Sequence, residues 1–481
     1  MTSKSPALLG LDAAFLYLEN ERSPMHIGSL ILMEGHTAEG PFDFATFRRR
    51  LERRVLRVPI LRQRLVQDPT GLGSPSWVDD EAFDLDHHLH HTSLAEPGGW
   101  AQLRSLMAHE IAQPLDRSRP LWEILFIDGL GDLPETPPGA VALISKMHHA
   151  AVDGVSGAEI LGALFDLSPE PGPEPERPPW RPTNAPSDLE LLLATGKRAI
   201  GKPLGLAKAV GRTVKGLAGS GALLALRRIK PPPVPFSAPR TPLNQPVGKL
   251  RSWDGVTLPL DRIKALKGRI EGATVNDVVL TICSGALRRY LGEHDALPED
   301  PLVAMAPISV RGDDEKSSLG NRVSAMLVPL ATHLPAPLER LQAIHRDAVG
   351  SKSYHRAIGA DTLTDYSNFV PFSVAALAAR LYTGMGAARL HRPAFNVVIT
   401  NVPGPQVPLY LGGSRMLSHL GTAPLFDGIG LLLAIFSYDG GLGIGVTACR
   451  RLMPDVEFFT NALSESLDEL EAAVSASEET R

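Results

Sequence analysis

Cysteine is scarce in this chain of 481 residues, which contains only Cys283 and Cys449. Two cysteines exclude a framework of several disulfide bonds and indicate a reducing compartment. Long apolar runs are missing as well, because no uncharged stretch reaches the roughly 18 residues that span a membrane. Asp12 interrupts the apolar run near the N-terminus, so we expect no secretory signal. We therefore expect a cytoplasmic protein, or one that attaches to a membrane surface without crossing it.

A large net charge is also absent, and this excludes further classes of function. The chain has 48 Lys and Arg against 53 Asp and Glu, a formal net charge of −5. This charge is too small to indicate a nucleic-acid partner or a strongly charged substrate. With 43% hydrophobic and 21% charged residues, the composition is that of a folded globular protein. At roughly 100–200 residues per domain, the length predicts two or three domains.

Helix and strand patterns alternate along the chain. Helical patterns occur in "LDAAFLYLE" and "FATFRRRLERRVLRVP", and strand patterns occur in "HIGSLILMEG", "LWEILFIDGL" and "VALISKMHH". A proline-dense stretch from Ser168 to Pro186 can hold neither a helix nor a central strand. We therefore expect an α/β protein with an N-terminal lobe at 1–165, a connection at 166–245 and a C-terminal lobe at 246–481.

The connection carries a run of cations. Between Gly196 and Lys230 there are nine Lys and Arg residues, from Lys197 to Lys230, and no acidic residue. A helix there would have an apolar face and an opposite basic face, formed respectively by Leu206, Val210, Val214 and Leu217 and by Lys208, Arg212 and Lys215. This pattern is typical of an amphipathic helix at an anionic membrane or lipid surface. The alternative is a solvated linker helix, and the many glycines weaken any helix here.

The stretch "MHHAAVDGVSGAEI" places two histidines and an aspartate directly after an apolar run. The preceding residues predict a buried strand, and Ser156 and Glu159 have the capping-box spacing that opens a helix. We therefore expect His148, His149 and Asp153 in a strand-to-helix turn, where side chains can point into a cleft.

Imidazole titrates near neutrality, so a histidine in this turn suits a base that takes a proton from an alcohol. Asp153 could fix the turn through an ion pair or backbone bonds, or it could orient the imidazole. Gly154 lets the backbone reverse where a β-carbon would clash.

A metal site is one alternative for these residues. It would use His148, His149 and Asp153, but adjacent histidines seldom aim at one ion, and no third firm ligand is nearby. The tract "DHHLHH", from Asp86 to His91, also resembles a metal site. It follows a run of acidic residues at an expected strand edge, so a solvated histidine cluster fits it better.

Three other interpretations stay open from the residues alone. "GVSGA", which begins at Gly154, approaches the G-x-S-x-G nucleophile elbow, but it ends in alanine and leaves the histidines without a role. "GKRAIGKP", which begins at Gly196, nearly spells a phosphate loop, but proline replaces the required Ser or Thr. Two satisfied core histidines are the structural alternative.

The pattern HHxxxDG, present as His148-His149-Ala-Ala-Val-Asp153-Gly154, resembles the hallmark of CoA-dependent acyltransferases. That superfamily includes carnitine and chloramphenicol acyltransferases and the condensation domains of peptide synthetases. Further segments, in order and spanning nearly the whole chain, resemble the bacterial wax ester synthase/diacylglycerol acyltransferase family. They are "LDAAFLYLENERSPMHIGSL", "SRPLWEILFIDGL", "TVNDVVL" and "TNVPGP".

The resemblance implies a pseudo-dimer of two chloramphenicol-acyltransferase-like lobes, with the HHxxxDG turn facing a central substrate channel. It implies that His149 is the general base, which deprotonates an acceptor hydroxyl for direct attack on the acyl-CoA thioester without a covalent intermediate. His148 would shape the site, and Asp153 would hold the turn. Cys283 lies at helix-core spacing and is expected to pack in the core rather than act as a nucleophile.

Two further residues carry over from the resemblance. Asn276 is expected in the first turn of a helix, with Thr274 as the N-cap for Asp277, and its amide could donate to a developing oxyanion. The alternative for Asn276 is a capping residue. Glu19 matches a family glutamate thought to influence catalysis, although its position alone indicates a surface carboxylate.

Two short motifs are expected to have structural roles. One positions the strand behind the site and consists of Pro120, Leu121 and Trp122, with Trp122 in the core by alternation along the strand. The other is the rigid turn "NVPGP", which contains Asn401, Pro403 and Gly404, and for which a role on the substrate side is the alternative.

The function implied by the resemblance is acyl transfer from acyl-CoA to diacylglycerol, to a long-chain alcohol, or to both. It requires no metal and no cofactor beyond CoA as part of the substrate. Lipid substrates favour attachment of Lys197–Lys230 to the inner membrane face or to lipid droplets. The alternatives are a carrier-protein-dependent or polyketide-linked acyltransferase of the same superfamily, and a lipid-surface protein without activity.

Overall fold

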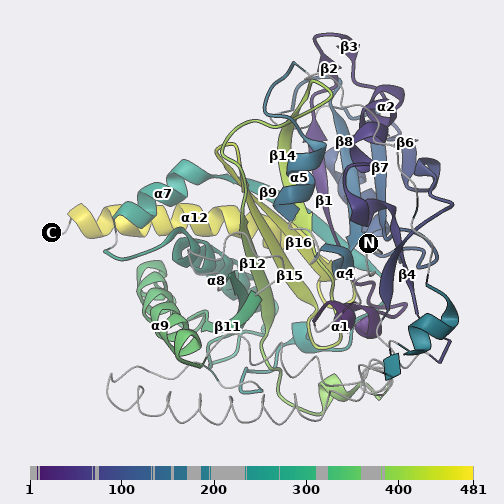
Figure 1. Ribbon diagram of the computed structural model, residues 1–481. Coiled ribbons are helices and arrows are strands. Elements are labelled where there is room, and N and C mark those ends of the chain that lie inside the picture. Colours follow the sequence, from purple (N-terminus) through teal and green to yellow (C-terminus); the bar gives the residue numbers. More distant parts are fainter. Residues whose placement is uncertain are drawn as a thin grey trace.

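The structure is a computed structural model (Figure 1). It describes residues 8, 11–67, 69–70, 75–131, 133, 136–152, 157–170, 182, 186–193, 195–196, 233, 236–269, 271–309, 323–358, 381 and 385–479. The basic amphipathic helix expected within Lys197–Lys230 lies outside these residues, as do Asp153 and Gly154. No helix in the described part of the chain is both long enough and apolar enough to cross a membrane.

A six-stranded sheet forms the centre of the first lobe, with the strand order β13-β14-β1-β8-β7-β6. β1 pairs with β8 and with β14, and β7 pairs with β8, all antiparallel, whereas β6 and β7 are parallel. The strands are β1 (His26–Met33), β6 (Leu89–Ser93), β7 (Trp122–Asp128), β8 (Val141–His148), β13 (Tyr410–Leu411) and β14 (Ser414–Thr422).

A second six-stranded sheet forms the centre of the other lobe, with the order β11-β10-β12-β15-β16-β9. The pairs β10–β12 and β12–β15 are parallel, and the remaining pairs are antiparallel. The strands are β9 (Arg251–Pro259), β10 (Val303–Ser309), β11 (Val323–Pro329), β12 (Val397–Pro403), β15 (Leu431–Tyr438) and β16 (Gly441–Cys449). The mixed α/β class and the two-lobe arrangement expected from the sequence are confirmed.

Two small two-stranded sheets complete the first lobe. They are β2–β3 (His36–Thr37 and Gly40–Pro41) and β4–β5 (Gln63–Val66 and Ser76–Asp79). Helices pack around both large sheets. The helices are α1 (Leu11–Leu18), α2 (Phe44–Val55), α3 (Trp100–Glu110), α4 (His149–Val152), α5 (Gly157–Leu164), α7 (Leu260–Gly268), α8 (Val275–Glu293), α9 (Pro337–Ile358) and α12 (Val456–Glu479). The helices and strands that the sequence predicts in the first 150 residues are thus confirmed as α1, α2, β1, β7 and β8.

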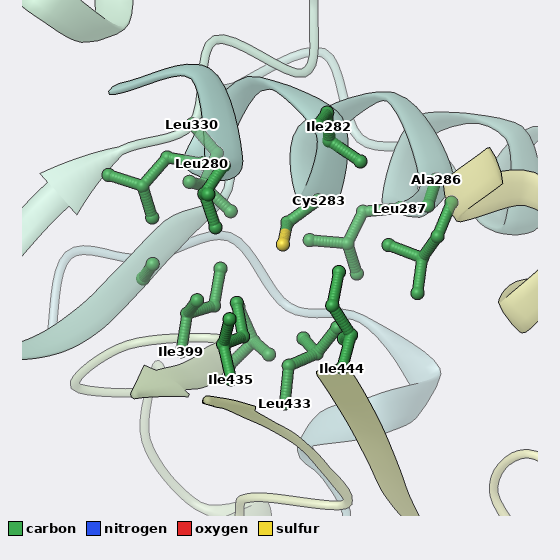
Figure 2. Packing of buried hydrophobic residues seen from close by; sticks show 14 of the residues in the cluster. Leu280, Ile282, Cys283, Ala286, Leu287, Leu330, Ile399, Leu433, Ile435 and Ile444 are labelled. Carbon is green, nitrogen blue, oxygen red and sulfur yellow. The ribbon is translucent and has the colours of Figure 1, made fainter. Parts of the chain in front are cut away.

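The largest core lies between the second sheet and a layer of helices. Figure 1 shows α8, α9 and α12 gathered on one side of this sheet, with the first sheet beyond its other side. Cys283 of α8 is fully buried there among aliphatic side chains such as Ile399 and Leu433 (Figure 2). Burial raises the pKa of the Cys283 thiol to about 12. A thiol in this environment stays protonated, which confirms the expected packing role.

The second half of the chain contributes two strands to the first sheet. β13 and β14 follow β12 in the sequence, within the range 246–481 assigned to the C-terminal lobe, yet they complete the first sheet beside β1. The lobe boundaries at residues 165 and 245 stay predictions. The two sheets do not correspond to two continuous stretches of sequence, because the first sheet contains strands from both halves of the chain. β14 also packs across β15 and β16 of the second sheet.

The crossing of β14 over β15 and β16 depends on two glycines that let the strands approach closely. A β-carbon added to Gly445 would lie 1.8 Å from the carbonyl oxygen of Gly421, closer than any real contact. A β-carbon added to Gly421 would lie 3.1 Å from Cβ of Ala434. The lobes can therefore approach this closely only if a residue without a side chain occupies position 445.

We expect Gly445→Ala to lower the free energy of unfolding by about 3 kcal/mol or more, because the obstacle is a backbone oxygen that no side-chain rotation can move. Urea unfolding measures the change. The matched control is Gly268→Ala at the end of α7, where no atom lies within 4 Å of the added β-carbon. That variant should stay within about 1 kcal/mol of the wild type. Equal stability of the two variants would contradict the crossing described here.

Candidate active site

The paired histidines lie where β8 ends and the single-turn helix α4 begins. β8 ends at His148, and α4 starts at His149 without an intervening residue. The backbone N–H of His148 donates to the carbonyl of Leu121 (2.9 Å), and that of His149 donates to the carbonyl of Met25 (2.8 Å). The turn is therefore fixed from two sides, by the residues that precede β7 and by those that precede β1. The predicted strand-to-helix position of both histidines is confirmed.

The His148 side chain is almost fully buried and has a defined tautomer. Its exposed fraction is 1%, and its Nδ1 accepts a hydrogen bond from the backbone N–H of Ala150 (3.1 Å). Because Nδ1 accepts, the proton of the neutral ring is on Nε2. Nε2 lies 3.6 Å from Oε1 of Glu19, longer than a normal hydrogen bond but close enough for an electrostatic attraction.

Glu19 is a buried carboxylate rather than the surface group that its position in the sequence indicated. Its side chain is 8% exposed. Oε2 accepts from Arg117 Nε (2.6 Å) in an ion pair, and Oε1 accepts from the backbone N–H of Met25 (3.2 Å). Burial alone would raise the pKa of Glu19, but His148, Arg117 and the Met25 N–H together lower it to about 2. The carboxylate is therefore ionised at neutral pH.

His149 has a different environment, in which the neutral imidazole is favoured. Its ring stacks on Phe15 of α1, with the ring centroids 3.7 Å apart and the planes inclined by 11°. Burial lowers the pKa of His149 to about 4; a contact with its own backbone carbonyl opposes the shift, and His148 adds to it. Nδ1 is buried and has no hydrogen-bond partner among the described residues. His149 is therefore an uncharged base at neutral pH.

Further titratable groups, which the sequence did not reveal, lie close to the turn on β1 and β8. His26 pairs with His148 across β1 and β8, and its Nε2 lies 3.1 Å from the carbonyl of Ile111. Burial, followed by the charge of Lys146, lowers the pKa of His26 to about 3. Lys146 is 4% exposed and forms ion pairs with Glu123 (2.9 Å) and Glu110 (3.5 Å). No local sequence pattern signals these pairs, because their members come from β1, β7, β8 and α3.

A second group of predicted residues gathers at the N-terminus of α8. Thr274 is the N-cap, and its hydroxyl accepts from the backbone N–H of Asp277 (3.2 Å). Asp277 Oδ2 accepts in return from the Thr274 N–H (2.9 Å) and also lies 2.9 Å from Nδ1 of His345 on α9. The predicted capping by Thr274 is confirmed, and the capping box leaves Asn276 free for another role.

Asn276 contacts the other predicted asparagine. Nδ2 of Asn401 donates to Oδ1 of Asn276 (3.3 Å), although 125 residues separate them in the sequence. The rigid turn predicted from Asn401 to Pro405 is wrong for its first part, because β12 continues through Pro403 in parallel register with β15. Gly404 follows the strand, where a β-carbon would lie 2.3 Å from the Ser437 carbonyl oxygen, so this position requires glycine.

The remaining predicted residues have structural positions. Pro120, Leu121 and Trp122 are buried, and the Trp122 indole donates to the Leu61 carbonyl (2.7 Å), which confirms the predicted core position of Trp122. In the tract "DHHLHH", His88 is buried and stacks on Trp122, with the ring centroids 4.6 Å apart, whereas His87, His90 and His91 are exposed. Within the described residues no cluster of three or more His, Cys, Asp or Glu could hold a metal ion.

The structure thus brings together two separate groups of predicted residues. One joins Glu19 to His148, with His149 as the next residue, and the other joins Asn276 to Asn401. No hydrogen bond or ion pair between described residues links the two groups. Arg117, Met25 and Phe15 hold the first group; Phe15 and Met25 lie in the first segment that resembles the family, but nothing in that segment assigned them this role.

Comparison with known proteins gives consistent matches over nearly the whole chain. The wax ester synthase/diacylglycerol acyltransferase catalytic domain matches residues 8–279, and the C-terminal domain of the same family matches residues 319–471. A putative diacylglycerol O-acyltransferase of Mycobacterium tuberculosis is 36% identical over 96% of this chain and 89% of its own length.

Solved structures agree with these matches. The wax ester synthase/diacylglycerol acyltransferase from Marinobacter aquaeolei VT8 has a TM-score of 0.69 at 29% identity, covering 98% of this chain and 99% of that one. The starter condensation domain of rhizomide synthetase has a TM-score of 0.54 at 15% identity, covering 98% of this chain and 95% of that one. The second match shows a shared fold only.

We expect Glu19→Gln to remove a pH-dependent part of the stability. Because the folded-state pKa of about 2 lies below the ordinary value of 4.5, the ionised carboxylate stabilises the fold above about pH 4.5. That stabilisation is lost as the pH falls towards 2 and amounts to about 3 kcal/mol at most. The difference in unfolding free energy between wild type and Glu19→Gln should therefore fall by about half or more from pH 7 to pH 3.

The control for this measurement is Glu21→Gln, two residues away. Glu21 is 82% exposed and forms an ion pair with Lys249 on the surface. Its replacement should change the unfolding free energy much less, because solvent screens exposed pairs. An identical pH dependence of wild type and Glu19→Gln would show that the buried carboxylate is not held as described.

Proposed function

The chain belongs to the wax ester synthase/diacylglycerol acyltransferase family, and on that basis we propose that it transfers a long-chain acyl group from acyl-CoA to diacylglycerol, to a long-chain alcohol, or to both. It is an acyltransferase. The observation that carries the finer proposal is the state of His149, a buried histidine with a pKa of about 4 at the end of β8. Such a ring is uncharged at every physiological pH, so one of its nitrogens is unprotonated and can accept a proton.

The proposed reaction is a direct transfer with His149 as the base. In this proposal the ring keeps its proton on the buried Nδ1, and Nε2 takes the proton from the acceptor hydroxyl. The oxygen attacks the thioester carbonyl, and the tetrahedral intermediate collapses with cleavage of the C–S bond. The departing CoA thiolate takes the proton back from Nε2, so the enzyme returns to its starting state. A thioester is already activated, so this route needs no covalent intermediate.

His148 and Glu19 position the base in this proposal and do not exchange protons with the substrate. Nδ1 of His148 is occupied by the Ala150 N–H, and its Nε2 faces the ionised Glu19. The pair therefore fixes the first turn of α4, in which His149 is the first residue. Asp153 is proposed to hold the far end of the same turn, as the family resemblance implies.

Asn276 is proposed to stabilise the oxyanion of the tetrahedral intermediate. Its Oδ1 accepts from Asn401, which leaves its own Nδ2 group to donate to substrate. Asn276 lies in the first turn of α8, where the positive end of the helix dipole also favours a negative charge. One oxyanion donor is typically worth about 10²- to 10³-fold in rate.

Attachment to a lipid surface is proposed because the acceptors are lipids. The basic stretch Lys197–Lys230 has the sequence pattern for it. The described part of the chain adds apolar side chains that are exposed beside cations, namely Phe236 (57% exposed), Met385 (70%) and Leu390 (76%) beside Arg389 and Arg392. The Phe236 ring contacts His391 edge-on, with the centroids 5.1 Å apart, so these segments lie together.

We expect purified protein to release CoA from palmitoyl-CoA only when diolein or hexadecanol is present, and the two rates will rank the acceptors. His149→Ala should lower the rate by about 10²- to 10⁴-fold, because the base is lost. His90→Ala, an exposed histidine on β6, is the control and should keep the full rate. No acceptor-dependent release by the wild type would favour a carrier-protein donor or a lipid-surface protein without activity.

The pH profile of kcat/KM gives this prediction a second readout, since it reports the pKa of the base in the free enzyme. His149 must be neutral to act, so activity should fall only as the pH drops through about 4. Protein returned to pH 7 must recover its rate, which separates titration from unfolding. A fall centred near the ordinary histidine pKa of 6.5 would contradict the buried state of His149.

We expect the protein to cosediment with vesicles containing anionic phosphatidylglycerol and to bind vesicles of pure phosphatidylcholine much less. Replacing Lys208, Arg212 and Lys215 together by Gln should lower the bound fraction on anionic vesicles several-fold, because each cation near an anionic surface contributes to binding.

The matched control replaces three exposed cations of α7 and its C-terminal end by Gln and so removes the same charge. They are Lys264, Lys267 and Arg269. This control should bind as the wild type does. An equal loss in both triple variants would show that binding depends on total charge and not on the connection.

A further inference from the structure

A cavity of about 290 Å³ opens among α8, α9 and α12, on the side of the second sheet away from α1 and α4 (Figure 1). Among the described residues, three guanidinium groups line it, those of Arg288, Arg289 and Arg340, together with the carboxylate of Glu469. Acyl transfer as proposed above gives these side chains no role. Guanidinium groups repel one another, so three around one cavity require an explanation.

Arg340 of α9 is the most buried of the three, with 2% of its side chain exposed. Its Nη1 donates to the carbonyls of Pro335 (2.6 Å) and Leu334 (3.1 Å). Nη2 lies 3.5 Å from Glu469, and Nε is buried without a hydrogen-bond partner in the described part of the chain. A guanidinium stays charged even when buried, so the charge of Arg340 is only partly compensated.

The charges around the cavity do not balance. Arg289 lies 3.4 Å from Glu469 and 3.2 Å from Glu465, and Arg288 donates to the Thr332 carbonyl (2.8 Å). With Glu465 counted, three positive charges meet two negative ones among the described residues here. Glu469 is shared between two arginines at distances near the outer limit of a hydrogen bond, so neither pair is tight.

Burial lowers the pKa of Arg340, Glu469 opposes the shift, and Arg288 and Arg289 add to it. A further negative charge in the cavity would relieve this mutual repulsion.

Of the two glycines of α8 at the cavity, Gly285 is required by the packing of α8 on α12, and Gly292 leaves open space. A β-carbon on Gly285 would lie 2.6 Å from Oγ of Ser466, closer than a real contact, and 3.4 Å from Nη2 of Arg340, an ordinary contact distance. No atom lies within 4 Å of the place where a β-carbon on Gly292 would be, although Gly292 lines the cavity. Glycine weakens the interior of a helix relative to alanine, so neither position is explained by helix stability.

The cavity is remote from the predicted catalytic residues. Arg288 is 12 residues beyond Asn276 on α8, which corresponds to about 18 Å along a helix. A ligand here would therefore be distinct from the acceptor hydroxyl and the thioester. It would contact three helices at once, α8, α9 and α12.

We propose that this cavity binds a phosphate group, either as inorganic phosphate or on a small phosphate ester. The planar fork of a guanidinium matches phosphate oxygens, and its N–H groups form charge-assisted hydrogen bonds with them. The cavity volume is at the lower end of the range for small-molecule sites, which suits a phosphate with a short substituent. The proposal concerns the helical layer of the second lobe and does not depend on the acyl-transfer mechanism.

Isothermal titration calorimetry of the full chain with inorganic phosphate, at ionic strength held constant with chloride, tests the proposal. We expect saturable binding to the wild type and at least about tenfold weaker binding to Arg288→Gln, because one charge-assisted donor is lost. Gly292→Leu, which fills the open space without meeting another atom at its β-carbon, should weaken binding as much. This second variant keeps the test valid if Arg288→Gln folds poorly.

Arg262→Gln is the matched control. Arg262 of α7 also pairs with carboxylates of α12, Asp468 and Glu471, but it does not line the cavity. This variant should bind phosphate as the wild type does. Tighter binding of glycerol 3-phosphate than of phosphate would identify an ester as the ligand, and equal binding would identify the free ion. Absence of saturable binding, or equal binding by all the variants, would overturn the proposal.

Discussion

The arrangement of the active-site turn depends on a single buried carboxylate. Glu19 follows the last residue of α1 and is held by Arg117 and by the backbone of Met25, while Met25 in turn accepts the N–H of His149. The same carboxylate faces His148. An ionised group this deep is stable only with partners on every side, so it fixes α1, the start of β1 and the end of β8 relative to one another. The ring of Phe15, one helical turn before Glu19, is thereby placed on His149.

The second constraint acts between the lobes. β14 belongs to the second half of the chain but pairs with β1 in the first sheet. It also packs across β16, where Gly445 has no side chain and the backbone of Gly421 can approach closely. The same half of the chain contributes Asn401, at the end of β12, to the N-terminus of α8. The first sheet is therefore completed by strands from the second half of the chain, whereas all six strands of the second sheet come from residues 251–449.

Sequence patterns predicted what depends on neighbours along the chain. A short apolar run rich in β-forming residues located β8, and a helical pattern located α1. Alternation placed Trp122 in the core, and capping chemistry placed Thr274. The patterns failed where long-range contacts decide. Glu19 follows a helix in a way that indicates a surface group, and its burial is made favourable by Arg117 and His148, which lie far away in the sequence. "NVPGP" indicates a turn, but pairing with β15 extends the strand through Pro403.

A base with a pKa of about 4 is too weak to deprotonate an alcohol fully before the alcohol attacks the thioester. Burial and the neighbouring His148 both disfavour the imidazolium that proton transfer creates on His149. Full proton transfer before attack would be costly, because it would leave a cation in an apolar site beside Phe15. Attack on the thioester creates a negative oxyanion at the same moment, and in a site of low dielectric the two opposite charges stabilise each other strongly. Proton transfer and carbon–oxygen bond formation should therefore be concerted, and the donor to the oxyanion matters as much as the base.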